Sequence, residues 1–381
     1  MSVDFVKMMP QLYKRRYLMQ IQNIIGGKIP CGFFCGISVQ SNIREIIENL
    51  KNSGFNLTCV FVLDESHKEV IGDVVVPLIT PKDLPNAEIK LMLYLNPYFD
   101  SAFFHYFQRY GIDILSLNNI DTEETNFNLY MDHLPELYKT HEIFSDEESK
   151  VAFRAYITGR LSQRVSDFKF APEAQYFLEG FLPKEGDIAI DGGAYDGATA
   201  RDFSMQGAKV YAFEMSAKNY TQCVDRAEKY NFVVENIGLS SGEGEEPYIE
   251  GGAGSSKKLG GGNAVAHFID LDTYVIRKNI PHVDYIKLDI EGAELDMLHG
   301  AAKTIVRYKP KMAISAYHRP EDLWTLVNYI KSIRSDYEFK FRHYRIDIKD
   351  YIFNDAERSI LKNFGQDYFL YTPCEAVLYC R

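Results

Sequence analysis

The stretch IAIDGGAYDGATA, residues 188–200, decides how the second half of the chain is interpreted. An apolar run enters a glycine-dense turn and continues into helix-favouring residues, which is the pattern of a strand, a tight turn and a helix. Dinucleotide-binding folds use G-x-G-x-x-G at this place. Here the order is Asp191-Gly192-Gly193-Ala194-Tyr195-Asp196-Gly197, which instead fits an acidic-x-Gly-x-Gly-x-Gly turn with Tyr195 in place of the middle glycine. This glycine turn, residues 191–197, therefore lacks the dinucleotide spacing.

The glycine turn suits a ligand without a pyrophosphate, such as S-adenosylmethionine. A turn between a strand and a helix presents backbone N–H groups and the partial positive charge of the helix N-terminus to a ligand. We expect Asp191 to hold the ligand's ammonium group directly or through water, and Gly193 to let the backbone approach the ligand. The predicted cofactor-binding turn comprises Asp191, Gly192, Gly193, Ala194, Tyr195 and Gly197.

An acidic residue follows at the spacing of ribose recognition. Glu214 ends the apolar run KVYAFE, 23 residues after Asp191. In doubly wound folds, an acidic residue about 20 residues beyond the turn accepts hydrogen bonds from the ribose hydroxyls. Asn236, at the end of the next predicted strand, is expected to lie near the adenine. Each of these is also an ordinary strand-end polar residue, but Asp191 and Glu214 at this spacing favour a nucleoside site.

The chain divides into two α/β parts. Strand patterns alternate with helical patterns in the first third, which predicts a parallel, Rossmann-like module over residues 1–120 that also lacks the glycine fingerprint. Residues 121–186 are expected to form a helical linker, in which Ser145 and Glu148 make a capping-box pattern. Alternation resumes afterwards, so residues 187–381 are predicted to form the second domain.

Composition narrows the classes of partner. The 381 residues include 53 Asp and Glu against 42 Lys and Arg, a net charge of −11, which argues against nucleic acid and anionic membranes as general partners. No segment approaches a membrane-spanning run. The six cysteines form no C-x-x-C pair and indicate reduced thiols. We expect a cytoplasmic protein without a membrane span, and the sequence leaves a homo-oligomer open.

Several stretches resemble the FkbM family of S-adenosylmethionine-dependent methyltransferases. They are IDGGAYDGATARDF, VYAFE, DYIKLDIEGAELDMLHGA, AISAYHRPEDLW and the terminal EAVLYC. The likeness covers residues 187–381, and IKLDIEGAE is its most specific block. It implies a class I methyltransferase fold: a doubly wound, mostly parallel α/β sheet of seven strands, one of them antiparallel, preceded here by the smaller Rossmann-like domain. It also implies O-methylation of a small hydroxylated acceptor, of the sugar or glycan-precursor type.

Methyl transfer to a hydroxyl needs the acceptor oxygen to be aligned with the methyl–sulfur bond of the donor. Because a hydroxyl is a weak nucleophile, a general base or a cation is also useful. Asp289 ends the run YIKLD and Glu291 follows, at the edge where doubly wound sheets bind ligands. We expect both to face the methyl donor and to bind the acceptor's hydroxyls or a cation such as Mg²⁺. Glu294 is interpreted as favouring the first turn of a helix. His318 is the expected general base, because the ordinary pKa of histidine lies near neutral pH.

Two other functions stay open on the same residues. One is a non-catalytic nucleotide or nucleotide-sugar binding protein, which a glycine turn blocked by Tyr195 would favour. The other is an NAD-dependent enzyme using the front module, with Asp64 as its ribose-binding residue, although both halves lack the fingerprint. The glycine-rich stretch 251–262 is expected to form either a lid over the acceptor or a surface loop.

Overall fold

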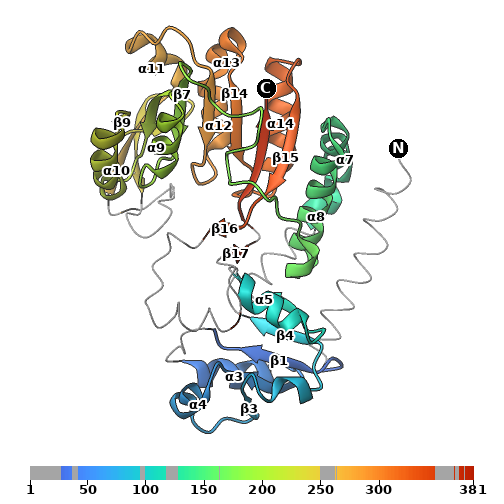
Figure 1. The fold of residues 1–381 in the computed structure, drawn as a ribbon. Helices are drawn as coiled ribbons and strands as arrows, with labels where there is room; N and C mark the ends of the chain where they lie inside the picture. The colour runs from blue at the N-terminus through green and yellow to red at the C-terminus, as the bar shows by residue number, and fades with distance from the viewer. Residues whose placement is uncertain are drawn as a thin grey trace. The chain divides into compact units, whose positions relative to one another are not determined.

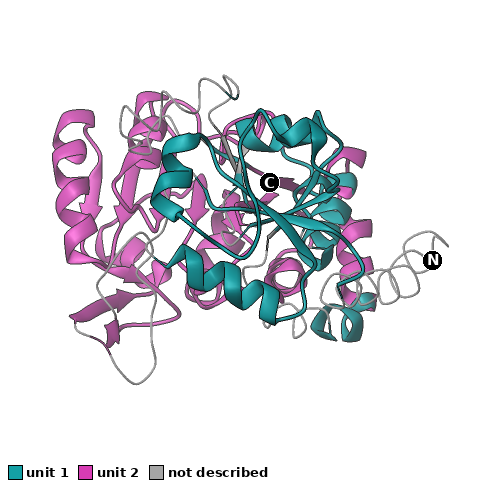
Figure 2. Cartoon of the chain, turned by 90° about the horizontal axis from the view of Figure 1, so that it is seen from below, with its two compact units in different colours: residues 1–134, 151–170, 345–373 teal, residues 135–150, 171–344, 374–381 magenta. Residues whose placement is uncertain are grey.

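The computed structural model describes residues 27–36, 42–94, 99–116, 128–162, 164–248, 262, 264–347, 364, 369–372 and 374–381. The chain forms two compact units that alternate along the sequence, as the colours of Figure 2 show. Unit 1 comprises residues 1–134, 151–170 and 345–373, and unit 2 comprises residues 135–150, 171–344 and 374–381. The stretch assigned to a linker is thus divided between the units, and part of the C-terminal region belongs to unit 1. None of the described helices combines the length and apolar character that crossing a membrane needs.

Unit 1 is built on a five-stranded sheet in the order β3-β2-β1-β4-β6, with all neighbouring strands parallel. The strands are β1 (Cys31–Phe34), β2 (Leu57–Phe61), β3 (Leu78–Ile79), β4 (Leu91–Tyr94) and β6 (Asp113–Ser116). The helices among them are α3 (Ile43–Asn52), α4 (Glu65–Ile71), the short 3₁₀ helix η2 (Leu84–Asn86) and α5 (Ser101–Gln108). This strand order is that of a Rossmann half, so the expected parallel front module is confirmed.

A later part of the chain completes unit 1. Strand β17 (Phe369–Tyr371) pairs antiparallel with β5 (Phe99–Asp100) and with β16 (Ile346–Asp347), and the 3₁₀ helix η3 (Val165–Asp167) lies against β6. The Asp64 side chain, the ribose candidate of the NAD alternative, caps helix α4 by accepting from the backbone N–H of His67 at 3.0 Å. Asp64 thus already has a structural role.

Unit 2 is built on a seven-stranded sheet in the order β15-β18-β14-β13-β7-β8-β9 (Figure 1). The strands are β7 (Ile188–Gly192), β8 (Lys209–Phe213), β9 (Val233–Glu235), β13 (Tyr285–Leu288), β14 (Lys311–Ser315), β15 (Phe339–His343) and β18 (Ala376–Cys380). Strand β18 is antiparallel to both of its neighbours, whereas the other pairs are parallel. The predicted doubly wound sheet with one reversed strand is confirmed.

Helices cover the sheet of unit 2 in adjacent pairs: α9 beside α10, α11 beside α13, and α12 beside α14. Their bounds are α9 (Ala198–Met205), α10 (Ala217–Tyr230), α11 (Leu271–Arg277), α12 (Glu294–Gly300), α13 (Ala302–Tyr308) and α14 (Asp322–Ile333). The core beneath α9 and α10 includes Phe203, Ala189 and Tyr285. Because side chains alternate along a strand, Asp191 and Lys287, two residues beyond Ala189 and Tyr285, face the same side of the sheet.

The polar stretch after β9 is partly a small sheet. Strand β12 (Ala264–Ile269) pairs with β10 (Gly238–Leu239) and, antiparallel, with β11 (Gly244–Tyr248). Apart from Gly262, the segment 251–262 lies outside the described residues, and so does the lid interpreted there.

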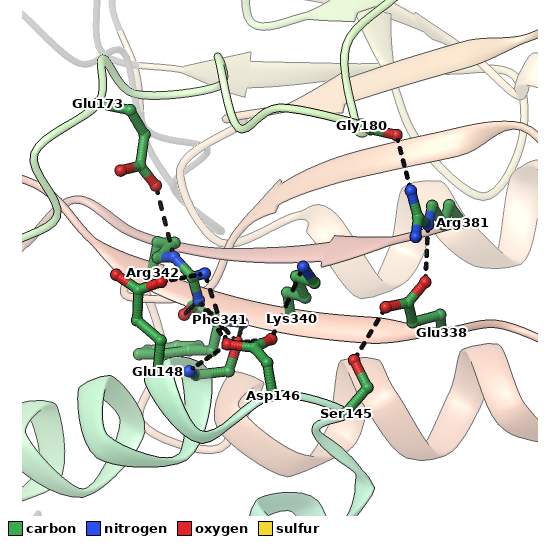
Figure 3. A network of polar contacts seen from close by, with 11 residues as sticks. Ser145, Asp146, Glu148, Glu173, Gly180, Glu338, Lys340, Phe341, Arg342 and Arg381 are labelled. Carbon is green, nitrogen blue, oxygen red and sulfur yellow. Dashed lines mark hydrogen bonds and ion pairs between the residues drawn. The ribbon is translucent and has the colours of Figure 1, made fainter.

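Helices α7 (Leu134–Ile143) and α8 (Glu147–Ser162) precede the seven-stranded sheet in the sequence, and the start of α8 is fixed to β15 (Figure 3). Arg342, whose side chain is 4% exposed, donates to the hydroxyl of Ser149 at 2.7 Å and to Glu148 at 2.9 Å. Asp146 caps the helix by accepting from the backbone N–H of Ser149 at 2.8 Å. The predicted capping box of Ser145 and Glu148 is therefore wrong: the capping carboxylate follows Ser145, and Glu148 binds the arginine.

Candidate active site

The glycine turn joins β7 to α9 through residues with left-handed backbone. Gly193 has φ +75°, Tyr195 +52° and Gly197 +81°. A Cβ atom on Gly193 would lie 1.8 Å from the backbone carbonyl oxygen of Asp289. Gly193 is therefore required by a close approach within the protein, at the end of β13. From the sequence we expected a close approach at this glycine, but to a ligand.

The other members of the turn have distinct positions. A Cβ atom on Gly192 would meet the Leu288 side chain at 2.9 Å, so this glycine also packs against the end of β13. Gly197 is the N-cap of α9. Ala194 is buried, whereas Tyr195 is 46% exposed. Residues 192–197 thus form a tight turn whose exposed member is the tyrosine that replaces the middle glycine.

Asp191 forms an ion pair with Lys287 inside the protein. The two residues are register partners on the adjacent parallel strands β7 and β13, and Nζ of Lys287 lies 3.0 Å from Oδ1 of Asp191. Burial disfavours the charged ammonium, but Asp191, Asp289 and Glu214 outweigh this effect and raise the pKa of Lys287. The ammonium also donates to the carbonyl oxygen of Gly193 at 2.6 Å. Asp191 has no exposed surface from which to hold a ligand's ammonium group, as the sequence analysis expected it to do.

Glu214 lies against the glycine turn, as its spacing predicted. Its carboxylate accepts from the backbone N–H of Tyr195 and of Ser216, both at 2.8 Å, and the residue is 6% exposed. Burial raises the pKa of Glu214, although the two hydrogen bonds oppose that shift. Asn236 donates to the backbone oxygens of Glu214 at 2.8 Å and Met215 at 3.1 Å. A carboxylate has about four acceptor positions, so Glu214 can still accept two more hydrogen bonds.

Four residues converge beside the end of β13, and we call them the acid–histidine cluster: Asp289, Glu291, Glu294 and His318. The ring of His318 is central, with Nδ1 2.9 Å from Oε1 of Glu294. Its Nε2 lies 3.4 Å from Oδ1 of Asp289 and 3.5 Å from Oε2 of Glu291. The side chain of His318 is 9% exposed and that of Glu294 has no exposed surface. The three residues nominated for catalysis therefore do meet, and Glu294 joins them.

The carboxylates change the expected behaviour of His318. Burial alone would lower its pKa, but Glu294, Asp289 and Glu291 raise it to about 9. The ring is then an imidazolium at neutral pH, and its positive charge faces the three carboxylates. The structure contradicts the assumption on which the general-base role rested, namely a pKa near neutrality.

Asp289 and Glu291 are held in different ways. Asp289 accepts from the hydroxyl of Tyr176 at 2.8 Å and from that of Tyr317 at 3.1 Å. Glu291 has a φ of +55°, which is uncommon for a residue other than glycine, and its side chain is 43% exposed. Backbone strain of this kind persists where the surrounding structure fixes it, often at functional sites. Glu291 is the most exposed carboxylate of the cluster.

Three residues of the site were missed from the sequence. Tyr176 lies in the stretch interpreted as a linker and carries no signal of its own. Glu294 was interpreted as a helix-start residue, and it does accept from the backbone N–H of Ile290 at 2.9 Å. Lys287 had a usable signal, because a lysine inside the apolar run YIKL requires an acidic partner on a neighbouring strand.

A protein-family model matches the part of the chain that carries this site. Residues 191–346 match the family model described as the methyltransferase FkbM domain. This part of the chain is an FkbM methyltransferase domain. The matched range contains the glycine turn, Glu214 and the whole acid–histidine cluster. Membership implies methylation that depends on S-adenosylmethionine.

One solved structure shares the fold of this chain. Methyltransferase FkbM from Methylobacillus flagellatus KT aligns over 96% of this chain and 93% of its own, with a TM-score of 0.64 and 18% identity. A putative rRNA methylase from Clostridium thermocellum covers 52% of this chain and 87% of its own at TM-score 0.29 and 12% identity. Fibrillarin from Aeropyrum pernix with bound S-adenosylmethionine covers 54% and 71% at TM-score 0.29 and 15% identity. No curated protein matches the chain.

Proposed function

We propose that the FkbM domain transfers the methyl group of S-adenosylmethionine to a hydroxyl oxygen of a small acceptor of the sugar or glycan-precursor type. The observation that carries the proposal is the direct attachment of the glycine turn to the acid–histidine cluster. The backbone N–H of Asp289 donates to the carbonyl oxygen of Gly192 at 3.0 Å, and Gly193 lies against the Asp289 carbonyl. Residues suited to a nucleoside and residues suited to a hydroxylated molecule thus occupy one sheet edge.

The donor's ribose fits Glu214, whose carboxylate is fixed by two backbone N–H groups and retains acceptor positions for two hydroxyls. Asn236 acts as a positioning residue because it holds the backbone at Glu214 and Met215. Asp191 positions Lys287, which in turn holds the Gly193 carbonyl. When bound, S-adenosylmethionine supplies the reactive methyl group. The same residues fit a nucleoside without catalysis, so turnover has to be measured as well as binding.

The acceptor's hydroxyl proton is lost in the reaction, and we assign Glu291 to receive it. Glu291 is the most exposed carboxylate of the cluster and its backbone is held in a left-handed conformation. Asp289 is fixed by two tyrosine hydroxyls and orients a neighbouring hydroxyl of the acceptor. Several carboxylates close together accept several hydroxyl hydrogen bonds at once, which favours an acceptor with adjacent hydroxyl groups.

Calorimetric titration with S-adenosylmethionine and S-adenosylhomocysteine tests the donor assignment. We expect one site per chain and an affinity lowered about 10- to 100-fold in Glu214→Gln, since a hydrogen bond to a charged group contributes about 1.5–3 kcal/mol. Glu228→Gln, on the exposed surface of α10, is the matched control and should bind as the unmodified protein does. A folded protein that binds neither ligand contradicts the donor assignment.

Transfer of a labelled methyl group to a panel of sugars, glycosides, amines and thiols tests the acceptor class. We expect labelling of a hydroxylated acceptor, and a Glu291→Gln variant with lower turnover and unchanged donor affinity. Labelling of amines or thiols alone would contradict the O-methyltransferase proposal. Donor binding without any turnover on the panel would favour a non-catalytic binding protein.

A further inference from the structure

We propose that Asp289, Glu294 and His318 form a binding site for a divalent transition-metal ion of the Mn²⁺ or Zn²⁺ class. Each of the three offers one ligand atom, and these atoms all lie within 4.8 Å of one another. They come from the end of β13, the start of α12 and the segment after β14, so three separate elements converge on one point. The existence of the site does not depend on the proposed function, but its role in catalysis does.

The unsatisfied polar atoms at this point provide a second, independent observation. Within the described residues, Oε2 of Glu294 has no hydrogen-bond partner although the residue has no exposed surface. Neither ring nitrogen of His318 has a hydrogen bond of acceptable geometry there, although carboxylate oxygens lie 2.9 to 3.5 Å away. Buried polar atoms are normally hydrogen-bonded or bound to a metal, and an ion between the three side chains would satisfy both residues.

Charge and ligand type indicate which ion. Three carboxylates of the cluster face a single imidazole, and Asp322, 3% exposed, is a further acidic group nearby. A dication would balance this excess of negative charge. A bound ion would displace the proton of the His318 ring, and the neutral imidazole suits transition ions, whereas Mg²⁺ and Ca²⁺ prefer oxygen alone. The sequence left Asp289 and Glu291 open to either the acceptor's hydroxyls or a cation such as Mg²⁺; the structure instead points to a mixed oxygen and nitrogen set that includes Glu294.

The site would act on the acceptor. An ion bound at Asp289 lies beside the glycine turn, where the proposed methyl transfer takes place. A cation held there would make the acceptor hydroxyl easier to deprotonate, and Glu291, which is outside the ligand set, would receive the proton. The metal would thus provide a positive charge at the oxygen that accepts the methyl group.

Calorimetric titration of the chelator-stripped full-length protein with Mn²⁺ tests the site, and Co²⁺ absorption spectra report its coordination. We expect one Mn²⁺ per chain, with affinity at least 10-fold weaker in Asp289→Asn and Glu294→Gln. His267→Gln is the matched control, because His267 pairs with Glu245 at 3.1 Å on the surface and its side chain is 64% exposed. Should Glu294→Gln fail to fold, Asp289→Asn, whose side chain is already 25% exposed, still decides the outcome.

Two results would overturn the inference: no saturable Mn²⁺ binding, or binding that Asp289→Asn weakens no more than His267→Gln does. Donor binding is measured separately, in the presence of chelator. Donor binding without Mn²⁺ binding rejects the metal site alone. Mn²⁺ binding without donor binding rejects the proposed function alone.

Discussion

Replacing Gly193 by alanine is the sharpest test of the contact between the glycine turn and β13. The new Cβ atom would lie 1.8 Å from the Asp289 carbonyl oxygen, and at least 3.0 Å is needed, so one of two buried backbone segments must move by about 1.2 Å. The left-handed backbone, φ +75°, adds about 1–2 kcal/mol for a residue with a Cβ. Movement also strains the hydrogen bonds from Asp289 to Gly192 and from Lys287 to Gly193, at about 1 kcal/mol each.

These contributions predict a loss of about 3–4 kcal/mol in the free energy of unfolding for Gly193→Ala. Gly186→Ala is the matched control: Gly186 has φ +85°, but a Cβ atom there meets nothing within 4 Å. It should lose only the conformational part, about 1–2 kcal/mol. A displacement of about 1 Å near the reacting groups also lowers turnover roughly 100-fold. Gly186→Ala should leave turnover unchanged.

Urea denaturation followed by tryptophan fluorescence measures this difference. Trp324 is the only tryptophan of the chain, is 5% exposed and lies on α14, so its emission reports the unfolding of unit 2. Donor affinity and turnover are measured on the same samples. Equal stability and equal donor affinity in the two variants would refute the reasoning, because the clash at Asp289 would then have no consequence.

Three further predictions follow from buried or charged groups. Lys287→Met should lower the free energy of unfolding by about 3–5 kcal/mol, because it leaves the Asp191 carboxylate buried without a partner; Asp191→Asn in the same protein should restore much of the loss, measured by urea denaturation. Asp64→Ala should weaken hydrogen-exchange protection of α4 at pH 7. The hydrogen bond from the Ser66 hydroxyl, and those from His67, lower the pKa of Asp64 from its usual 3.8 to about 2, so this stabilisation is complete above pH 4 and disappears as the pH falls through 2. Burial raises the pKa of Cys35 to about 12, and at pH 8 a thiol reagent should label only the half-exposed Cys374 rapidly, whereas the denatured chain should show six reactive thiols.

Local patterns in the sequence predicted most of the elements and the glycine turn. The run around β7, its turn and α9 was recognisable because strand and helix periodicity changes at the glycines. The spacing from Asp191 to Glu214 predicted ribose recognition, which stays a prediction; the Glu214 carboxylate does lie at the turn, since both positions lie at the same edge of a parallel sheet. The pairing of β17 with β5 was not predictable, because it joins residues far apart in the sequence through a short edge strand.

The errors at the site share one physical cause. The contacts and the pKa of a charged side chain depend on neighbours that are distant in the sequence. Asp191 has the same local sequence whether it faces a ligand or a lysine, and only the register of β7 with β13 decides this. His318 was assigned an ordinary pKa because its chain neighbours do not reveal that three carboxylates from another segment surround it. Glu294 has the position of a helix-start residue and accepts from the backbone N–H of Ile290 before the helix, and this position hid its contact with His318.

The glycine turn and the acid–histidine cluster, the two halves of the site, have little freedom to move independently. Lys287 joins Asp191 to the Gly193 carbonyl, and the residue two positions later, Asp289, donates its backbone N–H to Gly192 and contributes its side chain to the acid–histidine cluster. One short segment of chain, the end of β13, therefore fixes both the glycine turn and the cluster. In-line methyl transfer depends on alignment within about 0.5 Å, which a rigid element provides better than a loop. Variants in this segment should consequently lower turnover more than they lower the affinity for either ligand alone.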